Sequence, residues 1–81
     1  MVTFEWYDIS LCDQKRHDLI VHNISCGVCM MMIRKFLYER LREINKCLRK
    51  STLDAIGTLV YKSFIRKLNR DINFIDEYFY I

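Results

Sequence analysis

The sequence contains no proline and only two glycines, Gly27 and Gly57. These residue types shape most of the tight turns and linkers of small domains. Their scarcity predicts few turns and long regular elements, which favours helices. It also leaves no glycine-rich loop of the kind that binds phosphate groups.

A long apolar segment is missing as well. The densest apolar run, residues 28–33, is followed at once by Arg34 and Lys35, whereas a bilayer span needs roughly 18 to 20 apolar residues. The first ten residues carry Glu5 and Asp8 in place of the basic residues of a secretory signal. The four cysteines are even in number but make up only about 5% of the chain, which is below the cysteine density of disulfide-stapled secreted scaffolds. We therefore expect no membrane span and an intracellular protein of the cytoplasm or nucleus, not secreted, with reduced thiols.

The chain also lacks the residue patterns of common active sites. It has no pair of carboxylates in an acid–base arrangement, and no serine or cysteine nucleophile in a recognisable motif beside a histidine. Its 81 residues suffice for one domain, 1–81, which is too small to build a deep pocket around such groups. We predict that the protein is not an enzyme and needs no cofactor.

Apolar surface, by contrast, is abundant. Hydrophobic residues make up 52% of the chain and aromatic residues 14%, so the chain is expected to fold. Ser25 is suited to cap a helix, and Arg49 and Lys50 are suited to end one. Between them, apolar residues recur at spacings of three and four, which predicts a long central helix over about residues 25–50. The stripe consists of Met30, Ile33, Leu37, Leu41, Ile44 and Leu48.

A second apolar stripe follows after a short joint. It consists of Leu53, Ile56, Val60, Phe64 and Leu68. Ser51 or Thr52 would cap this helix, and the short joint would fold the two helices back so that their stripes face each other. Because Asp71 would fall on the apolar face, we predict a helix over about residues 52–68 and a break just after it. The spacing of apolar residues does not decide whether residues 72–81 form a helix or a strand.

The segment before the central helix carries weaker signals. Ser10 with Asp13 resembles a capping box and predicts a helix through about His22. Residues 2–7 alternate like a strand, and residues 18–24 are also compatible with one. The favoured fold is all-α, with three to four helices and the central helix packed on the second. The alternative is an α+β ferredoxin-like fold.

Cys26 and Cys29 form a C-x-x-C motif at the expected start of the central helix. Free backbone N–H groups and the helix dipole stabilise a thiolate there, which suits redox exchange or soft-metal binding. The motif resembles that of thioredoxin-like proteins, but the cis-proline on which that fold relies is missing. His22 would be a third ligand of a zinc or copper site. Cys12 and Cys47 are expected as small buried hydrophobes.

The residues around this motif also resemble the heavy-metal-associated domain of copper chaperones. The matching positions are Ile24, Ser25, Cys26, Cys29, Ile33 and Leu37, and residues 57–62 look like the third strand of that family. The resemblance implies a ferredoxin-like fold with a soft-metal site at Cys26 and Cys29. The sequence departs from the family where a strand should follow the first helix, because the helical period continues through Leu48.

The expected helix lengths resemble the histone fold, in which a short helix, a long central helix and a further helix follow one another. That family's second loop has residues similar to Lys50, Ser51, Thr52 and Leu53, although Gly57 stands where an aspartate is expected. The resemblance implies a helical shape and no particular function.

The net charge of +3 is unevenly distributed, since residues 25–50 hold seven basic and two acidic residues. At about 100° per residue, four of these basic residues fall in one arc opposite the apolar stripe of the central helix. They are Lys35, Arg42, Lys46 and Arg49. The simplest interpretation of this basic face is a solvated helix surface, with nucleic acid as a less favoured partner.

Five aromatic residues fit neither stripe: Trp6, Tyr7, Tyr38, Tyr78 and Tyr80. Large amphipathic rings dominate interface energetics, and a chain this small buries only part of its apolar surface. The sequence therefore predicts a non-enzymatic protein–protein interaction module or small subunit that dimerises or joins a complex, with these aromatics as anchors. The alternative is a small zinc- or copper-binding domain built on Cys26 and Cys29.

Overall fold

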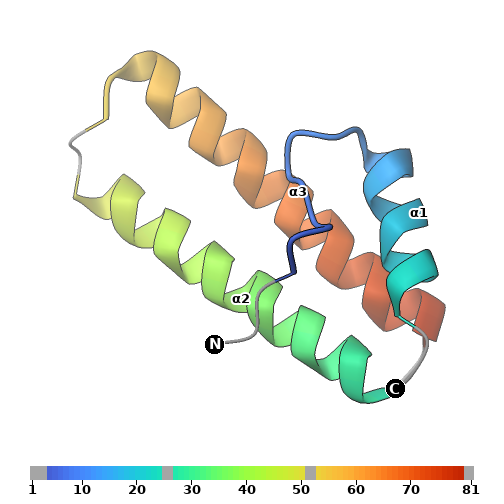
Figure 1. Ribbon diagram of the computed structural model, residues 1–81. Helices are drawn as coiled ribbons and strands as arrows, with labels where there is room; N and C mark the ends of the chain where they lie inside the picture. Colours follow the sequence, from blue (N-terminus) through green and yellow to red (C-terminus); the bar gives the residue numbers. More distant parts are fainter. Residues whose placement is uncertain (1–3, 25–26, 51–52, 80–81) are drawn as a thin grey trace.

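The computed structural model describes residues 4–24, 27–50 and 53–79, with the backbone alone at 27–29. These residues form three helices, α1 (Asp13–Asn23), α2 (Gly27–Arg49) and α3 (Ala55–Phe79), and no strand (Figure 1). The all-α prediction is confirmed, and the ferredoxin-like alternative is wrong. Its proposed third strand, residues 57–62, belongs to α3, because an apolar residue every three or four positions suits a helix.

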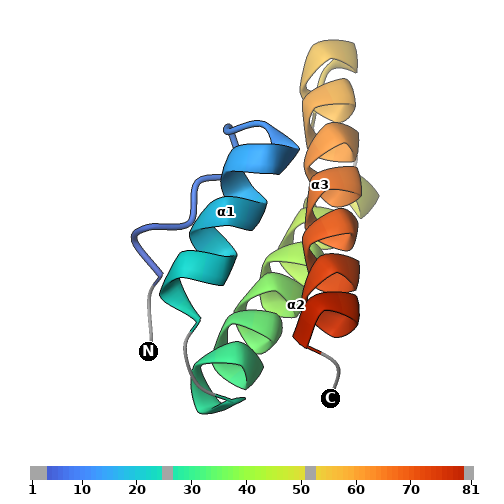
Figure 2. The same ribbon diagram turned by 90° about the vertical axis from the view of Figure 1, so that its right-hand side faces the viewer.

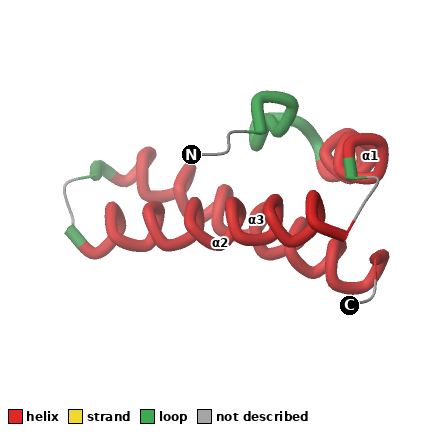
Figure 3. The backbone as a smooth tube through the Cα atoms, turned by 60° about the horizontal axis from the view of Figure 1, so that its bottom comes forward, coloured by secondary structure: helices red, strands yellow, loops and turns green. Residues whose placement is uncertain are grey.

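The helices form a long hairpin with a short helix on one side. α2 and α3 run antiparallel, side by side, and α1 packs against the C-terminal half of α3 (Figures 1 and 2). The segment of residues 4–12 lies on the same side of the α2–α3 pair as α1 (Figure 3). α1 is tied to the rest of the molecule chiefly through α3, not through α2, which follows it in the chain.

The core contains residues from all three helices, and α2 buries the stripe expected from its sequence. Met30, Ile33, Leu37 and Ile44 are buried, while Leu41 and Leu48 are half-buried at its edge. The remaining core residues come from α1 and α3 and from the residue that follows α1: Ile20, Ile24, Leu68, Ile72 and Ile75. Burial of apolar surface contributes about 25 cal/mol per Å² to the free energy of folding, so the packing of these core side chains is the main contribution to the stability of the fold.

α3 begins later than the sequence predicted. Its N-cap is Asp54, whose carboxylate Oδ1 accepts a hydrogen bond of 2.7 Å from the backbone N–H of Gly57. Ser51 and Thr52, the expected caps, lie outside the described residues. An aspartate is as good a cap as a serine, since either oxygen satisfies an N–H group that the helix itself leaves free.

α3 also ends later than predicted, because no break follows Leu68. The helix passes through Asn69, Arg70 and Asp71 and continues to Phe79. Asp71 does lie on the core side and is fully buried, as the helical period requires. The expected break was wrong because α1 supplies a charged partner for this carboxylate, so burial of Asp71 does not interrupt the helix.

α1 runs close to its predicted bounds, but it does not begin with a capping box. The N–H and hydroxyl groups of Ser10 both donate to Asp8 Oδ1, at 2.9 and 2.6 Å, which closes a turn before the helix. The N-cap is Cys12, with no side-chain bond to the helix. The strand expected at residues 2–7 is also wrong within residues 4–7, the part that the structure describes, since the N–H of Tyr7 donates to the carbonyl of Phe4 in a turn.

In the ranges that the structure describes, none of the helices is both long and apolar enough to cross a membrane.

Candidate functional site

A buried polar cluster joins α1 to α3. Asp71 Oδ2 accepts a bond of 2.8 Å from Nε of Arg16, and Oδ1 accepts one of 3.1 Å from Nη2. Both side chains are fully buried. The hydroxyl of Tyr7 donates to the same Oδ2, and Nε2 of His17 lies 3.1 Å from Oδ1. One carboxylate thus connects the N-terminal segment, α1 and α3.

Arg16 makes two further hydrogen bonds through its terminal nitrogens. Nη1 donates to the carbonyl of Leu11 at 2.6 Å, and Nη2 donates to Asp13 at 2.5 Å. Burial disfavours the charged guanidinium, but the bonds to Asp71 and Asp13 outweigh it and raise the pKa of Arg16 above its ordinary value. The same bond from Arg16 lowers the pKa of Asp13. Arg16 is therefore positively charged at neutral pH, and the carboxylates of Asp71 and Asp13 neutralise its charge.

Tyr7 stays protonated in this cluster. Burial raises the pKa of its phenol above the ordinary value, and the hydrogen bond to Asp71 raises it further because a phenolate cannot donate. The cluster has its donors and acceptors matched to one another, which is what a structural network requires. The one sign of this cluster in the sequence is Asp71 on an apolar stripe, because a carboxylate there requires a buried partner.

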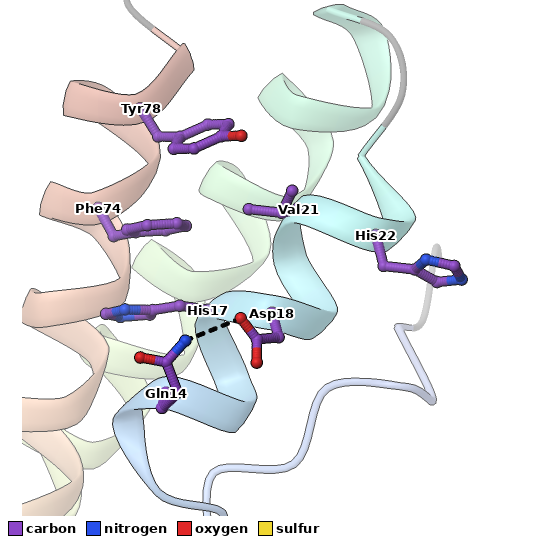
Figure 4. Close-up of a pocket in the computed structure, with 7 residues that line it drawn as sticks. All are labelled: Gln14, His17, Asp18, Val21, His22, Phe74 and Tyr78. Atoms are coloured by element: carbon purple, nitrogen blue, oxygen red, sulfur yellow. Dashed lines mark hydrogen bonds between the residues drawn. The ribbon is translucent and has the colours of Figure 1, made fainter.

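A shallow groove of about 550 Å³ runs between α1 and α3 (Figure 4). The ring of His17 stacks on Phe74 with centroids 4.1 Å apart, and Phe74 stacks in turn with Tyr78 at 5.3 Å. On the α1 side, the Gln14 amide donates to Asp18 at 2.9 Å. The groove is lined by Gln14, His17, Asp18, Val21, His22, Phe74 and Tyr78. The groove therefore presents aromatic and polar side chains along the contact between α1 and α3.

The predicted aromatic anchors lie in different places. Trp6 and Tyr7 are half-buried and pack inside the chain, Trp6 edge-on to Phe4 at 5.8 Å. Tyr38 is exposed on the outer face of α2, and Tyr78 is exposed at the α1–α3 groove. Tyr80 lies outside the described residues. Of the four anchors that the structure describes, only Tyr38 and Tyr78 are exposed, and they lie on different helices.

The basic face is exposed along α2. Its four residues, Lys35, Arg42, Lys46 and Arg49, are all exposed. Next to it, Met31 and Tyr38 line a groove of about 370 Å³, and the guanidinium of Arg34 lies over the Tyr38 ring at 5.3 Å. Nε of Arg34 also lies 2.7 Å from a carboxylate oxygen of Asp76, so α3 holds this arginine.

Three apolar residues lie exposed and close together in the first two turns of α3. Ile56 is 73% exposed, Leu59 67% and Val60 42%. Ile56 and Val60 were predicted to face the central helix. They do not, because α2 packs on the side of α3 that carries Leu68 and Ile75, whereas Ile56 and Val60 are rotated from these residues toward the side on which α1 packs only in the C-terminal half of α3. We call Ile56, Leu59 and Val60 the α3 patch.

The C-x-x-C motif cannot be placed, because Cys26 and the side chain of Cys29 lie outside the described residues. His22 is exposed and points away from Phe74 and Tyr78 (Figure 4). Cys12 and Cys47 are free and exposed, so their predicted burial was wrong. Cys12 precedes α1 as its N-cap, and Cys47 lies near the end of α2, after Ile44, the last buried residue of that helix. Within the described part of the chain, no three His, Cys, Asp or Glu side chains form a group that could hold a metal ion.

Comparisons of the chain with protein-family models, with curated proteins and with solved structures found no match.

Proposed function

We propose that this protein is a non-enzymatic interaction module that binds a protein partner, or a second copy of itself, through an exposed apolar helical surface. The α3 patch carries the proposal. Three aliphatic side chains lie within two turns of one helix, and two of them are more than 60% exposed. Clustered exposed aliphatic residues mark interaction sites more often than single ones do.

Binding of a partner at the α3 patch would be driven by the hydrophobic effect. Full burial of a Val, Leu or Ile side chain contributes about 1.5–3 kcal/mol, and α3 leaves most of this unused at the patch. Two of the predicted aromatic anchors, Trp6 and Tyr7, do not cover it, since they pack beside Phe4 and Phe36 instead. A partner helix or a second copy would recover this energy, less the cost of association.

A site-specific photo-crosslinker tests this proposal. Placed at position 59 in cells that make the protein, it is expected to give a discrete crosslinked species, because Leu59 would lie in the interface. The matched control is position 73, because Asn73 is exposed on the same helix outside the patch. Crosslinks of equal yield at both positions, or none at position 59, would contradict the proposal.

The soft-metal alternative rests on the sequence alone. If Cys26 and Cys29 bind zinc or copper, native mass spectrometry of protein purified without chelator should show a bound ion that Cys29→Ser removes. His22→Ala should weaken binding only if the imidazole is the third ligand. An unmetallated mass for the unchanged protein would reject this alternative.

A further inference from the structure

The α3 patch continues the face of α3 that α1 covers. Ile56 and Phe74 are 18 residues apart, and so are Val60 and Tyr78, which corresponds to about five full turns, so each pair points in the same direction. Phe74 is covered by the His17 ring of α1. α1 has 11 residues and α3 has 25, so the first turns of α3 extend beyond α1 (Figures 1 and 2). The same helix face is therefore covered by α1 at Phe74 and open at Ile56, while Tyr78 lies exposed at the edge of the covered part.

The covered half shows what kind of group fits this face. Nη1 of Arg70 binds a carboxylate oxygen of Asp13 at 2.8 Å, at the start of α1. Nζ of Lys67 donates to the carbonyl of Ile9 at 3.1 Å, in the segment before α1. The segment that covers this half of α3, residues 9–23, thus contacts it in two ways. An aromatic ring packs on Phe74, and two oxygen atoms, one of them from the acidic side chain of Asp13, accept hydrogen bonds from the basic residues Lys67 and Arg70.

The open half of α3 also has apolar side chains and basic residues, but α1 does not pack on it. Between Asp54 and Asp71, the sequence of α3 has four basic residues and no acidic one. Two of them, Lys62 and Arg66, are exposed, and neither makes an ion pair within the part of the chain that the structure describes. They lie three and seven residues after Leu59, which places them next to the α3 patch on the helix surface.

We propose that the open half of α3 binds an acidic amphipathic helix of a partner protein, which lies along α3 in line with α1. Its apolar side would cover Ile56, Leu59 and Val60, and its Asp or Glu residues would pair with Lys62 and Arg66. This inference rests on the proposed function and specifies the chemistry of the partner.

Charge argues against a second copy at this site. Residues 43–66 hold five basic and two acidic residues, so this half of the hairpin carries all of the net charge of +3. Two copies joined at the patch would bring two positive regions together, which raises the energy of the pair. An acidic helix gains from the same charge. The packing of α1 on this face favours a helix over a lipid surface.

Three synthetic peptides test the proposal by fluorescence anisotropy at two salt concentrations. The first has leucines at i, i+3, i+4 and i+7 with glutamates beside them, the second has lysines in place of the glutamates, and the third is a scrambled form of the first. We expect the acidic amphipathic peptide to bind at least tenfold more tightly than the other two. Binding should weaken as salt rises.

Variants of the protein locate the site. Leu59→Gln is expected to weaken binding of the acidic peptide at least tenfold, whereas Met31→Gln is the matched control, because Met31 is 64% exposed on α2. Lys62→Glu with Arg66→Glu should reverse the preference, so that the lysine peptide binds more tightly. Circular dichroism of each variant must retain the helical spectrum of the unchanged protein.

Other outcomes overturn the inference and separate it from the proposed function. Equal binding of the acidic and scrambled peptides, or an unchanged preference in the Lys62→Glu/Arg66→Glu variant, rejects the acidic helix. A dimer in sedimentation velocity that Leu59→Gln abolishes identifies a second copy, and binding to phosphatidylserine vesicles without peptide binding identifies a lipid surface. If position 59 still gives its crosslink while the peptides fail, the interaction function stands and the partner chemistry is wrong.

Discussion

Asp71 determines how the N-terminal part of the chain attaches to the hairpin. Its carboxylate is fully buried and has four donors around it, two from Arg16 and one each from Tyr7 and His17. A buried ion pair adds little net stability over an apolar pair of the same shape, but removal of one partner leaves a buried charge unbalanced. The cluster therefore specifies the position of α1 on α3.

Replacement of Asp71 should be strongly destabilising. Asp71→Leu leaves Arg16 charged and without its buried partner, so we expect the free energy of unfolding in urea to fall by about 3–5 kcal/mol. The double variant Arg16→Met/Asp71→Leu should recover most of this loss, since no charge remains to be balanced. A double variant as unstable as the sum of both single ones would show that the two residues are not coupled.

Tyr7 should make stability depend on pH in the alkaline range. Its pKa in the folded state lies above the ordinary value of 10.0, because burial and Asp71 disfavour the phenolate. Between these two pKa values the unfolded chain has lost a proton that the folded chain keeps, so stability falls as pH rises above about 10. Urea unfolding between pH 8 and pH 11 should show a steeper loss for the unchanged protein than for Tyr7→Phe. Parallel curves would contradict this role.

At the scale of elements, the ends of the helices depend on single polar side chains. α3 starts at Asp54 because its carboxylate binds the N–H of Gly57. α1 starts after the turn that Ser10 closes on Asp8, and the two bonds from Ser10 lower the pKa of that carboxyl. Several residues near each end had suitable side chains, so the sequence pattern alone could not select the cap.

Loss of the α3 cap should be measurable. Asp54→Ala removes the acceptor for the Gly57 N–H, and we expect a loss of about 1 kcal/mol in the free energy of unfolding. Asp54→Ser should retain most of the stability because its hydroxyl can accept the same bond. Glu77→Ala serves as the control for loss of an exposed carboxylate on the same helix. If Asp54→Ser is as unstable as Asp54→Ala, the cap is not the cause.

At the scale of the whole molecule, the two halves of the hairpin differ in their surroundings. The half that contains Leu68, Ile72 and Ile75 is covered by α2 on one side and by α1 on another. Within the described residues, the half of α3 that contains Ile56 and Leu59 contributes no buried residue. This asymmetry places the rigid core at one end and the open apolar surface at the other.

Amide hydrogen exchange should report this asymmetry. Backbone amides around Leu68 to Ile75 should exchange at the rate of global unfolding, whereas those at Leu59 and Val60 should exchange faster through local opening of the uncovered turns. Native-state exchange followed by mass spectrometry measures both in one experiment. Addition of a ligand for the α3 patch should slow exchange at Leu59 and Val60. Uniform protection along α3 would contradict the division into two halves.

The sequence by itself determined the helical class and the course of α2. The 3.6-residue period is a local property, and Met30, Ile33, Leu37 and Ile44 are buried as that period predicts. The location of the α1 helix could also be read locally, to within a few residues of its ends.

The tertiary structure alone decided which side of α3 faces the core and where α1 packs. The apolar residues of α3 cover more than one side, so Ile56 and Val60 fit a local stripe as well as Ile72 and Ile75 do. Arg16 and Asp71 pair across 55 residues of sequence, and neither residue carries a local sign of the other. That pairing directs the C-terminal half of α3 toward α1, keeps the helix continuous through Asp71, and leaves Ile56, Leu59 and Val60 open.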